Sequence, residues 1–488
     1  MQFDLTLHNG RIVTNDQILQ GDIGVRNGCI AAISDQLPEG KRSINANGRW
    51  VLPGGIDSHC HVEQLSGMGI MCADDFYSGT VSAAFGGTTT IIPFAAQHRH
   101  MSIPQVIADY AQKAAAKAVI DYGFHLILTS PDEAAMTTDL PNAIRNGITS
   151  FKVYMTYDMM KIDDAQILDV LALASQEGAL VMIHAENHDI IKWIARKLLK
   201  YGHTAPKFHA TAHDPIAEIE ATHRAICLGR LIDTPIMIVH VSTAQTVDII
   251  RHAQNLGAKV LAESCPQYLF LNINDLDRDS LEGAKFCCAP PPRTEADHEV
   301  IWQGLIDGTL TTYSSDHAPY RFNQTGKLPH GEQTHFREIA NGVPGLELRM
   351  PLLFSEGVSA GRISIEQFVD LTATNHAKTY GLEHRKGSIA IGADADIAVW
   401  NPEKEVTITA SMLHDNVGYS PYEGKTLKGW PEIVISRGRI VVENNQLCVQ
   451  AGSGEFIPRK KPEFQFNLKP KAGKDIQTKG FFKGLIGL

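Results

Sequence analysis

The alternation of apolar and polar residues divides this chain into two β-rich ends and a different middle. At both ends, short apolar or alternating runs are bounded by turn residues such as Asn-Gly. These runs lie at Phe3–His8, Gly10–Thr14, Asp22–Arg26, Cys29–Ile33, Ile397–Trp400, Glu405–Ile408 and Glu432–Val442. We therefore expect one small β-sandwich domain that both ends of the chain build together, from residues 1–53 and 381–455.

Between these ends, eight short apolar runs alternate with stretches of helical period. The runs are Ile56–His61, Thr88–Phe94, Phe124–Thr129, Ser150–Tyr154, Leu180–His184, Pro235–Val241, Lys259–Ala262 and Leu310–Ser314. The clearest helical stretches are Ile103–Lys117, Asp164–Gln176, Pro215–Leu228 and Thr246–Leu256. Eight buried strands alternating with helices predict an α/β fold, a (β/α)8 barrel of the TIM type over residues 54–380.

Composition and charge narrow the class of protein. The 488 residues suit one large barrel plus an accessory domain, and 43% hydrophobic with 20% charged residues is typical of a globular chain. The net charge of −10 gives no general attraction to nucleic acid or to an anionic membrane. No apolar run approaches the roughly 18 residues of a membrane span. Without a secretory signal or a C-x-x-C pair among the eight cysteines, we expect a reduced, cytoplasmic protein.

The C-terminal segment 456–488 differs in charge from the rest of the chain. It carries eight Lys or Arg residues against two acidic residues. Its charges fit a solvated tail or a clasp on an acidic neighbouring subunit, and its apolar end, Phe481–Ile486, suggests that part of it docks.

Histidine stands out by number, with 21 residues in the chain. Barrel enzymes carry their chemistry at the C-terminal ends of the strands, which gives a criterion for choosing among them. His59 and His61 end the first run, and positions i and i+2 of a strand share a face. His98 and His100 have the same spacing but lie outside any run, so we expect them on a loop surface.

Three later strand ends bring further metal-ligating side chains to the same mouth. His184 ends the fifth run, His240 is the next-to-last residue of the sixth, and Asp316 follows the eighth. One such histidine alone would be an ordinary core or rim residue. Together, imidazole and carboxylate groups without thiolates predict a site for Zn2+, Mn2+ or a similar divalent ion.

Lys152 lies within the fourth apolar run. Burial disfavours a charged amine, so we expect a lowered pKa. A neutral amine at a metal site can react with carbon dioxide to give a carbamate that bridges two cations. The alternative is a lysine that extends to the rim and stays in water.

At this point the sequence resembles the cyclic amidohydrolases, the group of dihydropyrimidinase and hydantoinase, with allantoinase and dihydroorotase as more distant relatives. The resemblance spans nearly the whole chain. It rests on the ordered His-x-His, Lys, His, His and Asp, and on the segments Gly54–His61, Ala73–Phe76, Phe85–Thr89 and Gly392–Ile397. It implies two divalent ions, most simply Zn2+ with Mn2+ as the alternative. His59, His61 and Asp316 would hold one ion, His184 and His240 the other, and carboxylated Lys152 would bridge them together with a hydroxide.

The resemblance also implies catalytic and substrate-binding roles. Asp316 would take the hydroxide proton and pass it to the leaving ring nitrogen. Tyr157 would donate to the developing oxyanion, the alternative being a packed rim aromatic. The backbone of Asn341 would hold the cyclic amide. Ala289 stands where hydantoinases usually have serine, a change that costs little if the residue acts through its backbone.

The implied activity is hydrolysis of a dihydropyrimidine or 5-substituted hydantoin to an N-carbamoyl amino acid. An allantoinase, a dihydroorotase or another imidase would use the same chemistry, although Val62–Gln64 stands where dihydroorotases carry a substrate arginine. A metal-free scaffold protein is a third possibility. The sequence argues against it, because every metal-ligand position carries a residue that can bind metal. The family usually forms tetramers, so we expect a homo-oligomer, a tetramer or a dimer, whose partner is a small-molecule substrate.

Overall fold

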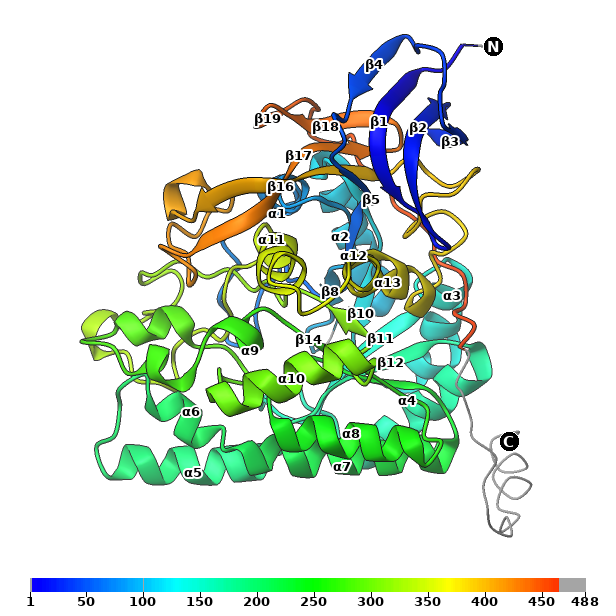
Figure 1. The fold of residues 1–488 in the computed structure, drawn as a ribbon. Coiled ribbons are helices and arrows are strands. Elements are labelled where there is room, and N and C mark those ends of the chain that lie inside the picture. The colour runs from blue at the N-terminus through cyan, green and yellow to red at the C-terminus, as the bar shows by residue number, and fades with distance from the viewer. Residues whose placement is uncertain (1, 100, 465–488) are drawn as a thin grey trace.

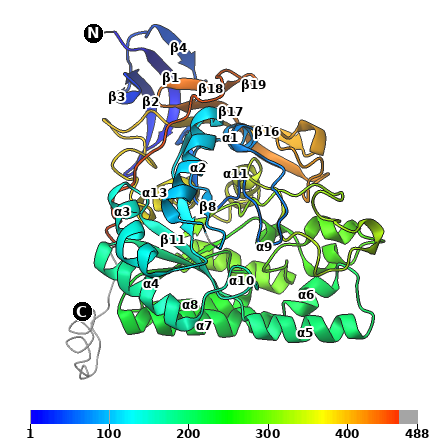
Figure 2. The same ribbon diagram turned by 180° about the vertical axis from the view of Figure 1, so that it is seen from behind.

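The computed structural model describes residues 2–99 and 101–464, and Figure 1 shows a β-rich layer above a body of strands and helices. Most of the expected basic tail, residues 465–488, lies outside the described residues. Figures 1 and 2 agree that the β-rich layer lies at the end of the molecule farthest from the long helices α5 (His188–Lys200) and α7 (Pro215–Ile232).

Both ends of the chain contribute to one nine-stranded sheet. Its path runs β19-β18-β17-β16-β5-β1-β2-β3, and β4 pairs with β1. The strands are β1 (Leu5–Val13), β2 (Ile18–Arg26), β3 (Cys29–Ser34), β4 (Arg42–Asn45), β5 (Trp50–Pro53), β16 (Ile397–Thr407), β17 (Thr426–Ser436), β18 (Arg439–Glu443) and β19 (Gln446–Leu447). Strands from the two ends of the chain therefore lie in one sheet. The sheet is continuous because β5 pairs with both β1 and β16.

Two local features of this sheet differ from the sequence prediction. The separate runs expected before and after Asn9 form the single strand β1, with a register shift between Leu7 and Gly10. Asn9 has a φ of 57°, and a Cβ at Gly10 would lie 2.5 Å from Val51. The run expected over 432–442 is instead a hairpin, because residues 437 and 438 both adopt positive φ between β17 and β18.

The middle of the chain supplies parallel strands. Seven form a sheet in the order β15-β14-β13-β12-β11-β10-β8, and β6, β7 and β9 form another. They are β6 (Gly55–Asp57), β7 (Thr88–Ile91), β8 (Phe94–Ala96), β9 (Asp121–Tyr122), β10 (His125–Ile127), β11 (Ser150–Tyr154), β12 (Leu180–His184), β13 (Ile236–Ile238), β14 (Val260–Ser264) and β15 (Thr312–Tyr313). Each of the eight predicted runs overlaps a strand. The second run is divided between β7 and β8 on either side of Pro93, which has no N–H for a ladder.

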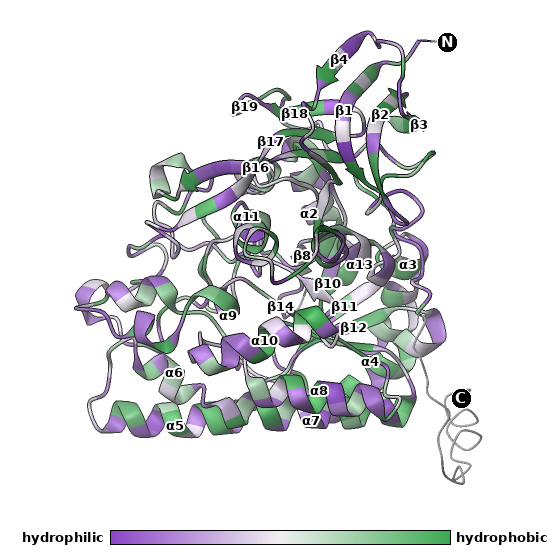
Figure 3. Cartoon of the chain, in the orientation of Figure 1, coloured by the Kyte–Doolittle hydropathy of each residue, from purple (hydrophilic) through white to green (hydrophobic). Residues whose placement is uncertain are grey.

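Helices cover the outside of these strands. The longer ones, besides α5 and α7, are α1 (Phe76–Phe85), α2 (Ile103–Lys117), α4 (Asp164–Glu177), α8 (Ala244–Asn255) and α10 (Glu295–Asp307). Ser102 caps α2 by accepting from the backbone of Gln105, and Asp163 with Gln166 forms a capping box on α4. Figure 3 shows mixed hydrophilic and hydrophobic stripes along α5, α7 and α8, as expected for helices that bury one face. None of the helices in the described ranges combines the length and apolar character that crossing a membrane requires.

The first residues of the expected tail pack on the central strands. Phe456 forms a bridge with Tyr122, and the Arg459 guanidinium donates to Ser150 Oγ at 2.7 Å. Arg459 is only 3% exposed, so it is neither solvated nor available to a neighbouring subunit. For this residue the expectation of a free basic tail is wrong, because the guanidinium fills a polar niche behind the strands.

Candidate metal centre

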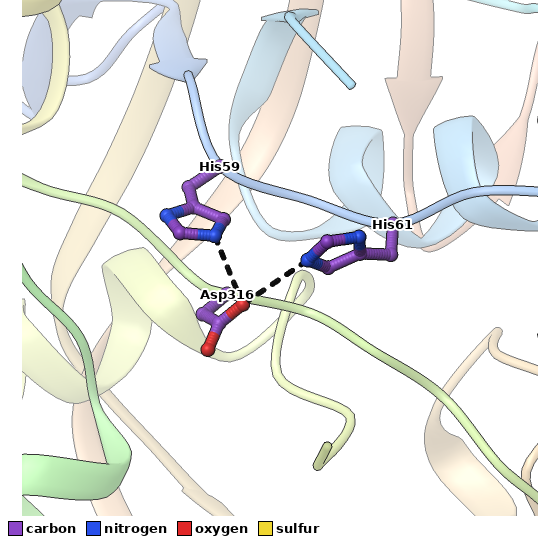
Figure 4. Close-up of side chains that lie close together, drawn as sticks. All are labelled: His59, His61 and Asp316. Carbon is purple, nitrogen blue, oxygen red and sulfur yellow. Dashed lines mark ion pairs between the residues drawn. The ribbon is translucent and has the colours of Figure 1, made fainter. Parts of the chain in front are cut away.

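His59, His61 and Asp316 meet at one end of the parallel strands. Figure 4 shows both imidazole rings turned toward the same carboxylate oxygen. Asp316 Oδ1 lies 3.1 Å from His59 Nε2 and 3.4 Å from His61 Nε2. Their candidate ligand atoms all lie within 4.8 Å of one another, and all three residues are buried. This is the donor set that a divalent cation requires.

The backbone around these residues is fixed by pairing between the first and last barrel segments. β6 ends at Asp57, so His59 and His61 follow the strand rather than lie within it. Cys60 forms a parallel bridge with His317, and His61 N donates to His317 O at 2.7 Å. Asp316 adopts a φ of 46°, a conformation that costs energy for a residue other than glycine. The surrounding pairing holds that strained backbone in place.

Polar partners orient both imidazoles. His59 Nδ1 hydrogen bonds with the buried carboxylate of Glu263, and His61 Nδ1 lies 2.8 Å from Gln64 Oε1. Glu263 also accepts from Ser314 Oγ at 2.7 Å. With Nδ1 engaged, each ring presents Nε2 toward Asp316. This is the usual way in which a second layer of groups fixes ligand histidines.

His184 and His240 form a second pair beside the first. His240 Nε2 lies 2.8 Å from His184 Nδ1, and the rings of His59 and His240 are 5.5 Å apart by centroid. His184 Nε2 lies 2.8 Å from Glu186 Oε2, so this ring too has a carboxylate behind it. His240 Nδ1 is buried without a hydrogen-bond partner among the described residues.

Lys152 lies against the first histidine pair, at His59. Its Nζ is 2.8 Å from His59 Nε2 and 4.3 Å from the centre of the Phe94 ring. The residue is 1% exposed, so the alternative of a lysine that extends to the rim does not apply. Burial lowers the pKa of Lys152 to about 8, although Asp316 and Glu263 partly oppose this.

The electrostatics of the cluster favour an ionised Asp316 and neutral imidazoles at His61, His184 and His240, whereas Glu263 and Asp316 outweigh burial at His59 and raise the pKa of that ring. Burial lowers the pKa of His61 to about 4, and burial also lowers the pKa values of His184 and His240. Burial alone would raise the pKa of Asp316, but the nearby His59 and His61 side chains lower it well below the usual range. Neutral imidazole and ionised carboxylate are the forms that bind a cation. The residues present therefore fit one or two divalent ions.

A cavity of about 320 Å3 opens beside this cluster. Tyr157, Ala289 and Asn341 line it, so the structure brings all three predicted substrate residues to the candidate metal centre. The Tyr157 ring lies 5.3 Å from the His184 ring by centroid. Burial raises the pKa of Tyr157 well above its ordinary value, which keeps its hydroxyl as a hydrogen-bond donor.

The structure also separates residues that sequence spacing could not. His98 lies half-buried in the loop after β8 and is not part of the metal-ligand cluster, whereas His100 lies outside the described residues. Met68 lines the cavity, but Met71 is 47% exposed and is not among the lining residues.

The orienting groups Glu263, Glu186 and Gln64 were not predicted. Glu186 follows His184 by two residues, just beyond the end of β12, so an acidic residue this close to a predicted ligand was a usable signal. Glu263 lies one residue beyond the end of the run predicted for the seventh strand, inside β14. A charged residue at the end of a buried strand is the signal that could have identified it.

Comparisons with known proteins identify the family of this chain. Residues 50–441 match the model of the amidohydrolase family. A D-hydantoinase from Rhizobium radiobacter is 42% identical over 459 residues, which cover 94% of this chain and 99% of the relative. A D-hydantoinase structure superposes with a TM-score of 0.91 at 41% identity, covering 95% of this chain and 100% of that one. The structure of the dihydropyrimidinase from Brevibacillus agri NCHU1002 also superposes with a TM-score of 0.91 at 41% identity, covering 94% of this chain and 99% of that one. The chain therefore belongs to the amidohydrolase family.

Proposed function

We propose that this protein is an enzyme that hydrolyses the ring amide of a dihydropyrimidine or a 5-substituted hydantoin to an N-carbamoyl amino acid. The observation that carries the proposal is a cluster of two histidine pairs, Lys152 and Asp316. All of these residues except His59 line a cavity that Tyr157 also lines. The D-hydantoinases and the dihydropyrimidinase that resemble this chain over nearly its full length support the same activity.

The proposed enzyme holds two divalent ions, with Zn2+ as the first choice and Mn2+ as the alternative. His59, His61 and Asp316 would hold one ion and His184 with His240 the other. Carbon dioxide would convert the buried Lys152 amine into a carbamate, N6-carboxylysine, placed between the two sets. When bound, such ions lower the pKa of a water molecule toward neutrality and polarise the substrate carbonyl.

The side chains of this chain would manage the proton and the developing charge. Asp316 takes a proton from the attacking water and delivers it to the ring nitrogen as the C–N bond breaks. The Tyr157 hydroxyl donates to the carbonyl oxygen while negative charge develops there. The backbone of Asn341 and Ala289 holds the ring amide, and an alanine at 289 supplies the same amide groups as a serine. The single ring-opened product carries both the new carboxylate and the carbamoyl-substituted amine.

The cavity suggests the kind of ring substituent. At about 320 Å3 it has room for more than an unsubstituted ring. Met68, Met159, Met160 and Phe336 line it, and methionine side chains adapt to irregular apolar groups. An apolar substituent at ring position 5 fits this lining best.

The proposal extends to the architecture and the setting of the enzyme. The parallel strands would form a closed (β/α)8 barrel, since the bridge between Cys60 and His317 joins the first segment to the last. All eight cysteines are free thiols, which suits the reducing cytoplasm. Trp193 and Tyr201, 57% and 71% exposed on and just after α5, suit a homo-oligomer, a tetramer or a dimer.

Metal analysis of the purified protein tests the proposal against a metal-free scaffold role. We expect close to two divalent ions per chain after loading with Zn2+ or Mn2+, together with ring-opening activity that a chelator removes. Fewer than one ion per chain after loading, with no activity, would reject the enzyme.

A further inference from the structure

Lys327 is a fully buried cation behind the cavity, with an exposure of 0%. Its Nζ donates to three backbone carbonyls, those of Cys287, Ala340 and Gly342, at 2.7, 2.8 and 2.5 Å. An ammonium group has three N–H donors, so all of them are used. Among the ion pairs of the described residues, none joins Lys327 to a carboxylate. The lysine is therefore held by carbonyl dipoles alone.

The three carbonyls belong to two chain segments that are far apart in sequence. One is 287–289 and the other is 340–342, and Ala289 and Asn341 in them line the cavity. Gly342 N also donates to Cys287 O at 2.9 Å, so Lys327 reinforces a direct contact between the segments. A Cβ at Gly342 would lie 2.3 Å from the Ala318 side chain, two residues after Asp316. A small shift of either segment would therefore disturb the wall of the cavity.

A compact loop delivers the ammonium to this point. Lys327 N donates to Arg321 O at 2.8 Å, and Leu328 N donates to Asn323 O at 2.9 Å. A Cβ at Gly326 would lie 2.2 Å from Arg321 O, so the loop closes tightly on itself. The loop thus fixes the backbone of Lys327, and the Lys327 side chain hydrogen bonds to both segments at once.

Packing alone does not require a charged side chain here. Methionine fills a similar volume without the desolvation cost of an ammonium. Burial lowers the pKa of Lys327 to about 8, and the protonated form with three donors remains the main one at pH 7. Hydrogen bonds from a charged donor are stronger than neutral ones, so they hold backbone atoms in narrow positions.

We propose that Lys327 is a positioning residue for the substrate, which fixes the spacing of the segments 287–289 and 340–342 so that Ala289 and Asn341 present their backbone to the ring amide. This role rests on the proposed ring-opening function, since it assigns a substrate to these two segments.

The test compares Lys327→Met with Leu7→Ala, a cavity variant in the nine-stranded sheet, where Leu7 is 1% exposed and remote from the cavity. Both are assayed as metal-loaded protein below their melting temperatures, with 5,6-dihydrouracil and 5-phenylhydantoin as substrates. Hydrogen exchange is measured over 284–289 and 338–343. We expect Lys327→Met to raise KM at least tenfold and to speed exchange in both segments, with wild-type metal content. Leu7→Ala should lower Tm without changing KM or exchange in these segments.

Lys327→Gln, which keeps two N–H donors, should give a KM between those of the wild type and Lys327→Met. A KM within twofold of the wild type in folded Lys327→Met overturns the proposal, whether or not exchange rises. The proposal is also overturned if neither Lys327→Met nor Lys327→Gln folds with bound metal, because Lys327 would then be required for folding. If the wild type opens neither ring, the proposed function fails by itself. Exchange in the two segments then still decides whether Lys327 holds them together.

Discussion

The strongest prediction of the structure concerns Lys152. Burial lowers the pKa of this amine from 10.5 to about 8, a change worth about 3 kcal/mol against the charged form. At pH 7 the neutral fraction rises from about 0.03% to about 10%, or roughly 300-fold. Only the neutral amine attacks carbon dioxide, with loss of a proton as the N–C bond forms. The site therefore favours a carbamate at a position where an exposed lysine would form almost none.

The perturbation is Lys152→Ala. The matched control is Lys161→Ala, which removes an exposed lysine that follows the cavity-lining Met160 in the sequence. In 13C-bicarbonate, the wild type and Lys161→Ala should show a carbamate NMR signal that Lys152→Ala lacks. Lys152→Ala should also bind less than two ions and lose at least about 100-fold in turnover, because even an outer-layer partner of a metal ligand is worth 10–100-fold. Acetate or propionate should restore part of the activity.

Two results would refute this reasoning. If Lys152→Ala turns over as fast as the wild type, the carbamate has no role in the reaction. A fully active wild-type protein without a carbamate signal in 13C-bicarbonate would show that the buried amine stays unmodified.

Three further predictions follow from the surroundings of the cluster. Tyr157→Phe should cut kcat about 100- to 1,000-fold with unchanged metal content, and a normal kcat would exclude the hydroxyl as the oxyanion donor. Because burial raises the pKa of Tyr157, deprotonation of this hydroxyl should not lower the wild-type rate in a pH-rate profile up to pH 10. A decrease in rate below pH 10 that disappears in Tyr157→Phe would contradict the assignment. Glu186→Gln should weaken metal binding about 10- to 100-fold in isothermal titration while the metal-free protein keeps its Tm within a few degrees, and wild-type affinity would show that Glu186 does not orient His184.

Local sequence patterns predicted the elements around the site well. The runs at Ser150–Tyr154 and Leu180–His184 are β11 and β12 to the residue, and Ile103–Lys117 is α2. These segments combine a clear period with strong boundaries, such as the Ser102 cap before α2. Strand ends were located correctly at Tyr154 and His184, whereas β6 and β13 end two residues before His59 and His240. The order of strands, more than their exact ends, brought these side chains into one predicted site.

What could not be predicted depends on contacts between distant segments. The pairing of β5 with β16, which makes one continuous sheet from the two ends of the chain, leaves no local signature. Glu263 and Gln64 touch the histidines that they orient, and Lys327 joins the segment 340–342, which follows it, to the segment 287–289, which precedes it by about 40 residues. Arg459 looked like part of a basic tail because charge alone does not reveal a buried niche.

The most direct test of the central claim is ring opening by the metal-loaded protein. The substrates are 5,6-dihydrouracil, hydantoin, 5-phenylhydantoin, allantoin and dihydroorotate, each followed by chromatography of the N-carbamoyl product. We predict turnover of dihydrouracil or a 5-substituted hydantoin that depends on added Zn2+ or Mn2+. Turnover confined to allantoin or dihydroorotate, or no ring opening at all by protein that carries two ions, would contradict the account.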